Sequence, residues 1–484
     1  MKRISLSLIT LLVIVNAYSQ TGQNEYEEWK PSKDEYANFD ISKYFTPDVV
    51  RNQLDINFDL NSNYSHSNSN ANNGDGYLSN WKISNSNLTW NMAPGFLRYV
   101  NTRKKITNFT INLSLNGSYV SQKDNYTSTS SSYLDNRFNT VSSNSLGLGW
   151  SNQWYFSKPF FMVYNISSDV SYNFTRDKTE NLTAVSDQKQ NQFVFNFSPQ
   201  VGIGYGRIEN VEDARQAVYI ANALSKKNVL TRNLSNEELF ELSQQISTVK
   251  NKRFLDSRLH LADEITTVDS FFVKNNLLSN NGAAYFTTLY DMWQYGALFS
   301  RRSGYEISFV AAPRYTYDNT KNTPELQNDY LYPQHRTYLE TDLSFNYEKP
   351  VKLNWQHSVA VAGYAIFPEK QTESNSKYYY PKTFVALARY SLGYYPNTRT
   401  NIQGTVGQQI GRMTYGPDIV PESSTYYLAL LGANVYYYIS PYFRISGSYN
   451  LNYQHYLGKY NVAGSTKSNY FYTAFSIHLI YSIF

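Results

Sequence analysis

The chain of 484 residues contains no cysteine and few charged residues, and both shortages limit what it can be. Without cysteine it has no disulfide framework and no lipid-modified N-terminal cysteine. Charged residues make up 17% of the chain, whereas ordinary globular proteins carry about 25%. The net charge of +5 is too small to indicate a nucleic-acid-binding protein.

Long apolar runs are also scarce, and the one continuous run lies near the N-terminus. A multi-pass helical membrane protein is excluded, because each span needs about 20 mostly apolar residues. Residues 1–19 begin with Lys2 and Arg3, continue with the apolar stretch 6–15 and end in Ala17-Tyr18-Ser19. This pattern predicts a secretory signal peptide that is removed after about Ser19.

The chain is instead rich in aromatic residues, with 46 tyrosines and 27 phenylalanines, which argues against a disordered protein. From residue 51 apolar and polar residues alternate: Leu54, Ile56, Phe58 and Leu60 against Asp55, Asn57 and Asp59. Such alternation is typical of a strand with one face toward lipid and the other toward water. It recurs and predicts fourteen strands, at about 53–65, 79–100, 105–121, 143–156, 161–175, 190–206, 303–318, 335–348, 352–367, 380–395, 398–413, 425–439, 442–457 and 467–483.

The connections between these strands are of two kinds. Some are short and flanked by aromatic residues, as at 348–351 and 439–442, and others are long and polar, as at 121–142 and 318–334. Short periplasmic turns and long extracellular loops are typical of outer-membrane barrels. The sequence therefore predicts an all-β transmembrane fold, an antiparallel up-and-down outer-membrane β-barrel of about fourteen strands with an α-helical periplasmic insert.

The strand count depends on one ambiguous segment, 285–300, which could be a strand or a helix. Bacterial single-chain barrels have an even number of strands, so we interpret it as helix. The predicted organisation is a signal peptide at 1–19, a periplasmic N-terminal lead-in at 20–50, strands one to six at 51–206, a helical periplasmic insert at 207–302, and strands seven to fourteen at 303–484.

Within the insert, three further patterns predict helices. Asn210 is a candidate N-cap before a stripe of Ala214, Ala217, Val218, Ala221 and Leu224. Ser235 and Glu238 form a capping box before Leu239, Leu242, Ile246 and Val249. A third helix is expected over about 252–274, with its inward residues at Leu255, Leu259, Ala262, Ile265 and Val268.

No catalytic, cofactor-binding or metal-binding motif is present. The six histidines lack metal-ligand spacing, and no nucleophile elbow or phosphate-binding loop occurs. We expect no enzyme activity and no cofactor, although a hydrolase site assembled through space at the barrel rim stays open. The candidate polar lumen residues are Asp55, Asn57, Asp59, Asn112 and Asn116, and the candidate docking or plug residues of the insert are Arg215, Glu238, Arg253, Arg258 and Trp293.

Three functions fit these features. The first is a porin or channel-like transporter of unknown solute in the bacterial outer membrane, in contact with phospholipid and lipopolysaccharide. The second is a non-conducting accessory subunit of a multiprotein outer-membrane machine that docks through its insert. The third is surface glycan binding, for which the tyrosines at 378–380 are candidates. Whether the insert plugs the lumen or hangs below it stays open.

The Tyr- and Asn-rich strands, the signal peptide and the terminal Phe484 resemble uncharacterised, porin-like outer-membrane β-barrels of the Bacteroidota. The segments 211–217 and 285–293 resemble inserts of the same family. In that family the residues alternating inward from the terminal aromatic are apolar, whereas here the apolar residues Leu479, Tyr481 and Ile483 have the other parity. The resemblance implies a fold and a location, but no activity.

Overall fold

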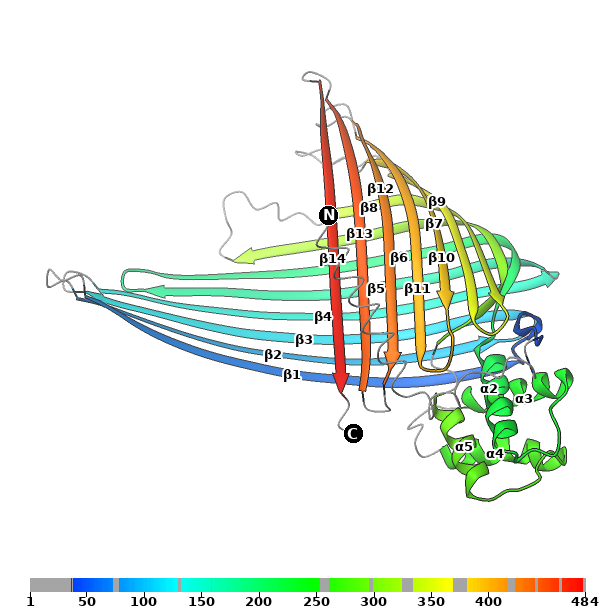
Figure 1. Cartoon of the computed structure of the whole chain (residues 1–484). Coiled ribbons are helices and arrows are strands. Elements are labelled where there is room, and N and C mark those ends of the chain that lie inside the picture. The colour runs from blue at the N-terminus through cyan, green and yellow to red at the C-terminus, as the bar shows by residue number, and fades with distance from the viewer. Residues whose placement is uncertain are drawn as a thin grey trace, which may run out of the picture.

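The computed structural model describes residues 36, 38–72, 78–128, 132–157, 159–252, 261–295, 299–323, 334–368, 381–415, 423–439, 443–460 and 464–481. Fourteen strands form one antiparallel sheet in which each strand pairs with the next along the chain (Figure 1). The predicted up-and-down topology of fourteen strands is therefore confirmed. The strands are β1 (Val49–Asn72), β2 (Leu78–Asn101), β3 (Lys105–Ser128), β4 (Ser132–Ser157), β5 (Phe160–Asn181), β6 (Val185–Asn210), β7 (Arg302–Thr323), β8 (Gln334–Val351), β9 (Trp355–Pro368), β10 (Lys382–Tyr394), β11 (Thr400–Thr414), β12 (Ser423–Tyr438), β13 (Phe443–Tyr460) and β14 (Gly464–Tyr481).

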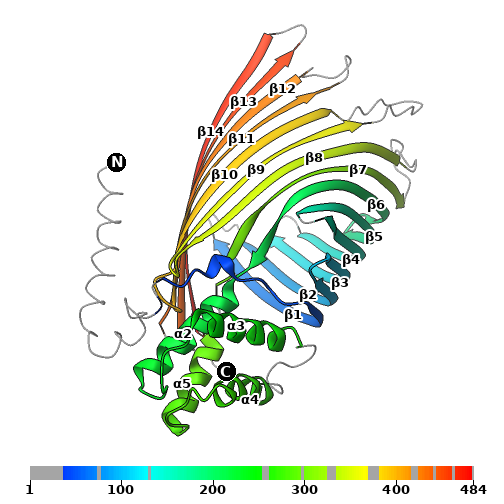
Figure 2. The same cartoon turned by 90° about the vertical axis from the view of Figure 1, so that its right-hand side faces the viewer.

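The sheet is strongly curved but not closed (Figure 2). Among the described residues β1 pairs with β2 alone and β14 with β13 alone, so these two strands form its edges. In the same part of the chain, no helix has both the length and the apolar character needed to cross a membrane.

The strands differ in length between the two halves of the chain. Strands β1 to β7 have 22 to 26 residues, whereas β8 to β14 have 13 to 18. A transmembrane strand needs only about 9–11 residues. The first seven strands therefore extend well past such a span, at the end opposite the short turns.

This extension corrects one prediction. The segment 121–142, expected as a long loop, is a hairpin in which β3 runs to Ser128 and β4 begins at Ser132. The period-two signal fails there because both faces of the strands carry polar residues, so no apolar alternation marks them. The second predicted loop, 318–334, begins within β7, and residues 324–333 lie outside the described residues.

In the described part of the segment between β6 and β7, four helices lie beyond the short-turn end of the strands and outside the curve of the sheet (Figures 1 and 2). They are α2 (Glu212–Lys226), α3 (Asn236–Lys250), α4 (Leu261–Lys274) and α5 (Ala283–Tyr295). The helical interpretation of 285–300 is confirmed over the range of α5. The capping box of Ser235 and Glu238 at the start of α3 is also confirmed.

Two details of the helix prediction are wrong. Asn210 ends β6 rather than capping α2, whose N-cap is Val211 without a side-chain hydrogen bond. Ala262, expected to face inward, is exposed, while Ile265 and Val268 are buried. Leu255 and Leu259 lie outside the described residues.

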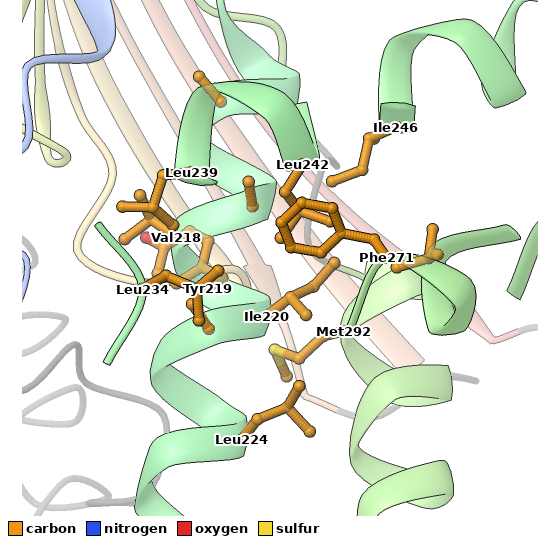
Figure 3. Close-up of a cluster of buried hydrophobic side chains, with 14 of the residues drawn as sticks. Val218, Tyr219, Ile220, Leu224, Leu234, Leu239, Leu242, Ile246, Phe271 and Met292 are labelled. Carbon is orange, nitrogen blue, oxygen red and sulfur yellow. The ribbon is translucent and has the colours of Figure 1, made fainter. Parts of the chain in front are cut away.

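The helices enclose a compact apolar core (Figure 3). The predicted stripe of α2 and that of α3 are both buried in it, as are Phe271, Phe272 and Leu289 from the other two helices. The sheet has no comparable interior, since its buried apolar cluster among the described residues consists of Tyr155, Phe161 and Val163. The helical insert therefore has a core of its own.

Candidate pore wall and helical insert

The two faces of the sheet differ in chemistry, as the alternation of the sequence predicts. Because directly paired residues of neighbouring strands lie on the same face, each row of pairs can be followed across the sheet. One row carries Leu54, Phe96, Ile111 and Leu148, and the next row carries Asp55, Gly95, Asn112 and Gly147. We call these the outward and the inner face.

Polar side chains of the inner face form a ladder of hydrogen bonds that joins β1 to β2 and runs from β3 to β7. Asn91 Nδ2 donates to Asp59 Oδ2 at 3.3 Å, Asn116 Nδ2 to the Ser143 carbonyl at 3.3 Å, and Ser143 Oγ to Asn173 Oδ1 at 2.6 Å. The ladder continues from Asn173 through Gln192 to Asp318. The inner face of these strands is therefore hydrophilic at every strand, as a water-filled wall requires.

All five candidate lumen residues lie on this face. Asp55 and Asn112 share one row, while Asp59 and Asn116 share the row that contains the ladder. Asn57 lies between them, opposite Ala93. Their role in solute passage stays a prediction.

Carboxylates outnumber guanidinium groups along the inner face at the level of the outward apolar residues. One acid–base pair there is satisfied internally, with Arg314 Nε 2.6 Å from Glu340 Oε2. The strand register places on this face the carboxylates Asp55, Asp59, Asp169, Glu306, Asp318, Glu340, Asp342 and Glu348, and the guanidinium groups Arg51, Arg314, Arg336, Arg389 and Arg444. An excess of acidic groups in a narrow aqueous passage attracts cations.

Two buried arginines fix the helical insert to the short turns. Arg301, immediately before β7, is 0% exposed and donates to the carbonyls of Leu353 and Trp355, both at 2.7 Å, and to Gln356 Oε1 at 3.0 Å. Burial, reinforced by the nearby positive charge of Arg215, lowers the pKa of Arg301 to about 10, so it remains charged at neutral pH.

Arg215 of α2 makes the second attachment. It is 1% exposed, and its NH2 donates to the Asn397 carbonyl at 3.0 Å, in the turn between β10 and β11, and to the Tyr219 hydroxyl at 2.9 Å. The ring of Tyr395 lies 4.8 Å from the guanidinium of Arg301 and 5.4 Å from that of Arg215. The insert is thus held against two different turns by charge-assisted hydrogen bonds.

The N-terminal lead-in contributes to the insert, which sequence reasoning missed. Phe39 and Ile41 are buried in the helical core, and Tyr44, just after the short helix η2 (Ile41–Lys43), donates a hydrogen bond from its hydroxyl to the Ser243 carbonyl at 3.2 Å. Tyr36 accepts a hydrogen bond from the Leu234 amide at 3.1 Å. The aromatic residues of the lead-in were the available signal, but their partners lie about 200 residues away in the sequence.

The candidate docking residues of the insert have other environments than expected. Arg215 anchors the insert, and Trp293 is buried at 4% exposure with its indole N–H donating to Glu264 Oε2 at 3.0 Å. Neither is available to a partner at the surface. Glu238 belongs to the capping box and pairs with Arg232 at 2.7 Å. Arg253 and Arg258 lie outside the described residues, as do the tyrosines at 378–380.

Within the described part of the chain, no three or more His, Asp or Glu side chains gather in a way that could hold a metal ion.

Comparisons with known proteins add little to this geometry. No family model and no curated protein matches the chain. Among solved structures, it is similar to CdiB from Acinetobacter baumannii, with a TM-score of 0.25, 7% identity, and coverage of 89% of this chain and 66% of that one. It is also similar to the outer membrane protein OprD from Pseudomonas aeruginosa, with a TM-score of 0.24, 8% identity, and coverage of 93% and 98%. These likenesses are too low to carry an argument about this protein.

Proposed function

We propose that the protein is a channel of the bacterial outer membrane that passes small hydrophilic solutes and prefers cations. The observation that carries this proposal is the separation of the two faces of the sheet, apolar outward and polar inward from β1 to β7. An outward apolar face suits phospholipid and lipopolysaccharide, and a hydrophilic wall suits water and polar solutes. A barrel of fourteen strands is intermediate in width between one of eight strands, whose interior side chains can fill, and the open porins of sixteen to eighteen strands.

Passage of a solute requires a closed barrel, and we infer that β1 and β14 pair with each other in the membrane. An unpaired strand edge is not tolerated in lipid, because no water is present to satisfy its amide and carbonyl groups. Export of the chain by a signal peptide removed after about Ser19 belongs to the same proposal. Mass spectrometry of the mature N-terminus tests that cleavage.

The central experiment is the conductance of the purified protein in a planar lipid bilayer under a gradient of potassium chloride. We expect steady conductance with a reversal potential of the sign given by cation preference. Replacing Asp55 and Asp59 by Asn removes two carboxylates from the inner wall and shifts the reversal potential toward zero. Tyr64→Ala, on the outward face of β1, is the matched control and leaves it unchanged.

The role of the insert is tested by a variant without it. Asn210 and Arg302 are directly paired, so an Asn-Gly turn in place of residues 211–301 can join β6 to β7. Because the lead-in packs into the insert, this variant begins at Pro47. A higher conductance of the variant would show that the insert regulates the channel. Absence of conductance in both the full chain and the variant would contradict the channel proposal.

A second function, docking to a larger membrane machine, is favoured by the surface of the insert. Phe286 and Tyr290 lie one turn apart on α5 and are 55% and 39% exposed. Exposed apolar groups on such a domain are typical of a protein–protein contact. If this function holds, a partner of defined mass crosslinks to the native protein and not to the variant F286A/Y290A. The variant Thr266→Ala, at an exposed position of α4, serves as the control.

A further inference from the structure

The extended parts of β2, β3 and β4 carry three aromatic side chains in one row on the inner face. Trp81 is directly opposite Tyr126, and Tyr126 is directly opposite Tyr133. The rings of Trp81 and Tyr126 are 5.4 Å apart between centroids and inclined by 60°. Trp81 and Tyr133 are each 43% exposed. We call these three residues the aromatic row.

The aromatic row is not explained by contact with the membrane interface. It lies on the inner face, and Trp81 is seven residues past Leu88 of the outward face, or about 23 Å along the strand. The outward residues between them are polar: Ser86, Ser84 and Lys82. The outward face of β2 is therefore polar at this level.

A buried carboxylate next to the aromatic row holds an exposed guanidinium group. Arg137 donates from Nε and NH2 to Asp135 Oδ2, both at 2.8 Å. The Asp135 side chain is 3% exposed, whereas that of Arg137 is 59% exposed. Because two of its nitrogens are fixed by Asp135, the guanidinium presents its remaining N–H groups to solvent in a defined orientation.

A second carboxylate at the same place has an acceptor atom that lacks a donor. Asp124 is directly opposite Asp135, and Gln122 Nε2 donates to Asp124 Oδ2 at 2.9 Å. The other oxygen of Asp124, Oδ1, is buried without a hydrogen-bond partner among the described residues, whereas the Asp135 carboxylate also interacts with the Tyr133 hydroxyl. Buried acceptors of this kind are costly unless a ligand or water supplies the donor.

We propose that this surface binds a neutral oligosaccharide. The aromatic row offers ring faces to the C–H groups of a sugar ring. Arg137 donates to sugar oxygens, while Asp124 and Asp135 accept from hydroxyl groups. Ser69 of β1 lies directly opposite Trp81 and continues the row, and Ser65 and Ser67 follow on the same face of β1. Their short side chains leave room for a chain of several sugars.

The charge of the surface decides between neutral and anionic sugars. Asp177 lies on the same face, opposite Asn139, so three carboxylates stand against the single guanidinium of Arg137. Sulfated, phosphorylated or uronic acid sugars would be repelled. This proposal does not rest on conduction, because the aromatic row lies beyond the membrane level.

The test is isothermal titration calorimetry of the full chain in detergent with a set of hexasaccharides: cellohexaose, maltohexaose, laminarihexaose and mannohexaose, with hexagalacturonate as the anionic probe. We expect at least one neutral probe to bind. The variant Trp81→Ala should bind it at least tenfold more weakly, and Trp81→Phe should recover part of the affinity. Tyr64→Ala, at an exposed tyrosine on the outward face of β1, should bind normally.

Asp135→Asn keeps the shape of the side chain and guards against a folding defect of Trp81→Ala. It should weaken binding about tenfold while the circular dichroism spectrum stays that of the native sheet. Absence of binding by every neutral probe, stronger binding of hexagalacturonate, or equal losses in Tyr64→Ala and Trp81→Ala would each overturn the proposal. Conductance measurements on the same samples report on the channel separately.

Discussion

The sheet and the helical insert reach stability by different physical means. In the insert, Leu239, Leu242 and Ile246 are completely buried. In the sheet, Phe58, Phe309 and Leu343 remain 64%, 48% and 53% exposed, and order comes from the continuous ladder of paired strands. Packing therefore limits substitution in the insert, whereas in the sheet the main requirement is the polarity of each face.

The largest expected effect tests this difference directly. Leu242→Ala leaves a cavity in the helical core and should destabilise the insert by about 2–5 kcal/mol. Phe309→Ala, at an outward position of β7, creates no internal cavity. Hydrogen exchange of the α2 amides should rise in the first variant alone. A comparable rise in Phe309→Ala would show that the insert and the sheet unfold as one unit.

The second prediction concerns the attachment between the two regions. Arg301→Met keeps side-chain volume but leaves the carbonyls of Leu353 and Trp355 without their donor, at a cost of about 2–4 kcal/mol. The insert should then become sensitive to trypsin while the sheet resists.

The neighbouring Arg302 gives the control. Its side chain is 56% exposed and lies 3.5 Å from Glu348, so Arg302→Met should change stability by less than about 1 kcal/mol. Equal sensitivity of both variants would argue that the buried hydrogen bonds of Arg301 do not hold the insert in place.

The same contrast explains what could be predicted from the sequence. Alternation revealed the fourteen strands because neighbouring residues of one strand, such as Leu54 and Asp55, lie on opposite faces and differ in polarity. Helical stripes such as Ala217 and Leu224 revealed the insert for the same reason. The signal failed where both faces are polar, as along 121–142, and where partners are distant in sequence, as for Tyr44 and Ser247.

The site shows the same limit. The candidate lumen residues could be assigned to a face by parity alone. The anchoring role of Arg215 could not be predicted from the sequence, because it depends on the carbonyl of Asn397 and on burial against Tyr395. The aromatic row likewise depends on strand register, which places Trp81, Tyr126 and Tyr133 side by side although they come from three strands.

A smaller effect should appear as a pH dependence confined to the insert. Burial, reinforced by the neighbouring Asp213 carboxylate, raises the pKa of Glu212 from 4.5 to about 7, while Lys250 opposes the shift. Between these values the folded insert keeps a proton that the unfolded chain releases. The contribution of Glu212 to stability should therefore be greatest below about pH 4.5 and fall by about 1–2 kcal/mol as the pH rises to 7, the half-buried position reducing the full effect.

Urea titrations followed by tryptophan fluorescence at pH 5, 6 and 7 would measure this change. Glu212→Gln should flatten the profile and stabilise the insert at pH 7. A profile that keeps its slope in the variant would assign the pH dependence to another group. The mobility of the sheet on unheated gels, a measure of its folded state, should not vary over this range.

The smallest effect compares similar hydrogen bonds in the two regions. Asn173 accepts from Ser143 on the wet inner face at 2.6 Å, and water can replace it, so Asn173→Ala should cost less than about 1 kcal/mol. Ser247 bonds Tyr44 at 2.7 Å inside the insert, where Ser247→Ala removes this bond together with the one that Ser247 donates to the Asp213 carboxylate and should cost about 1–3 kcal/mol. Thermal unfolding of both variants measures the two losses of stability and therefore their ratio. Equal costs would mean that the inner wall excludes water at Asn173, and a dry wall would also contradict the proposed passage for hydrophilic solutes.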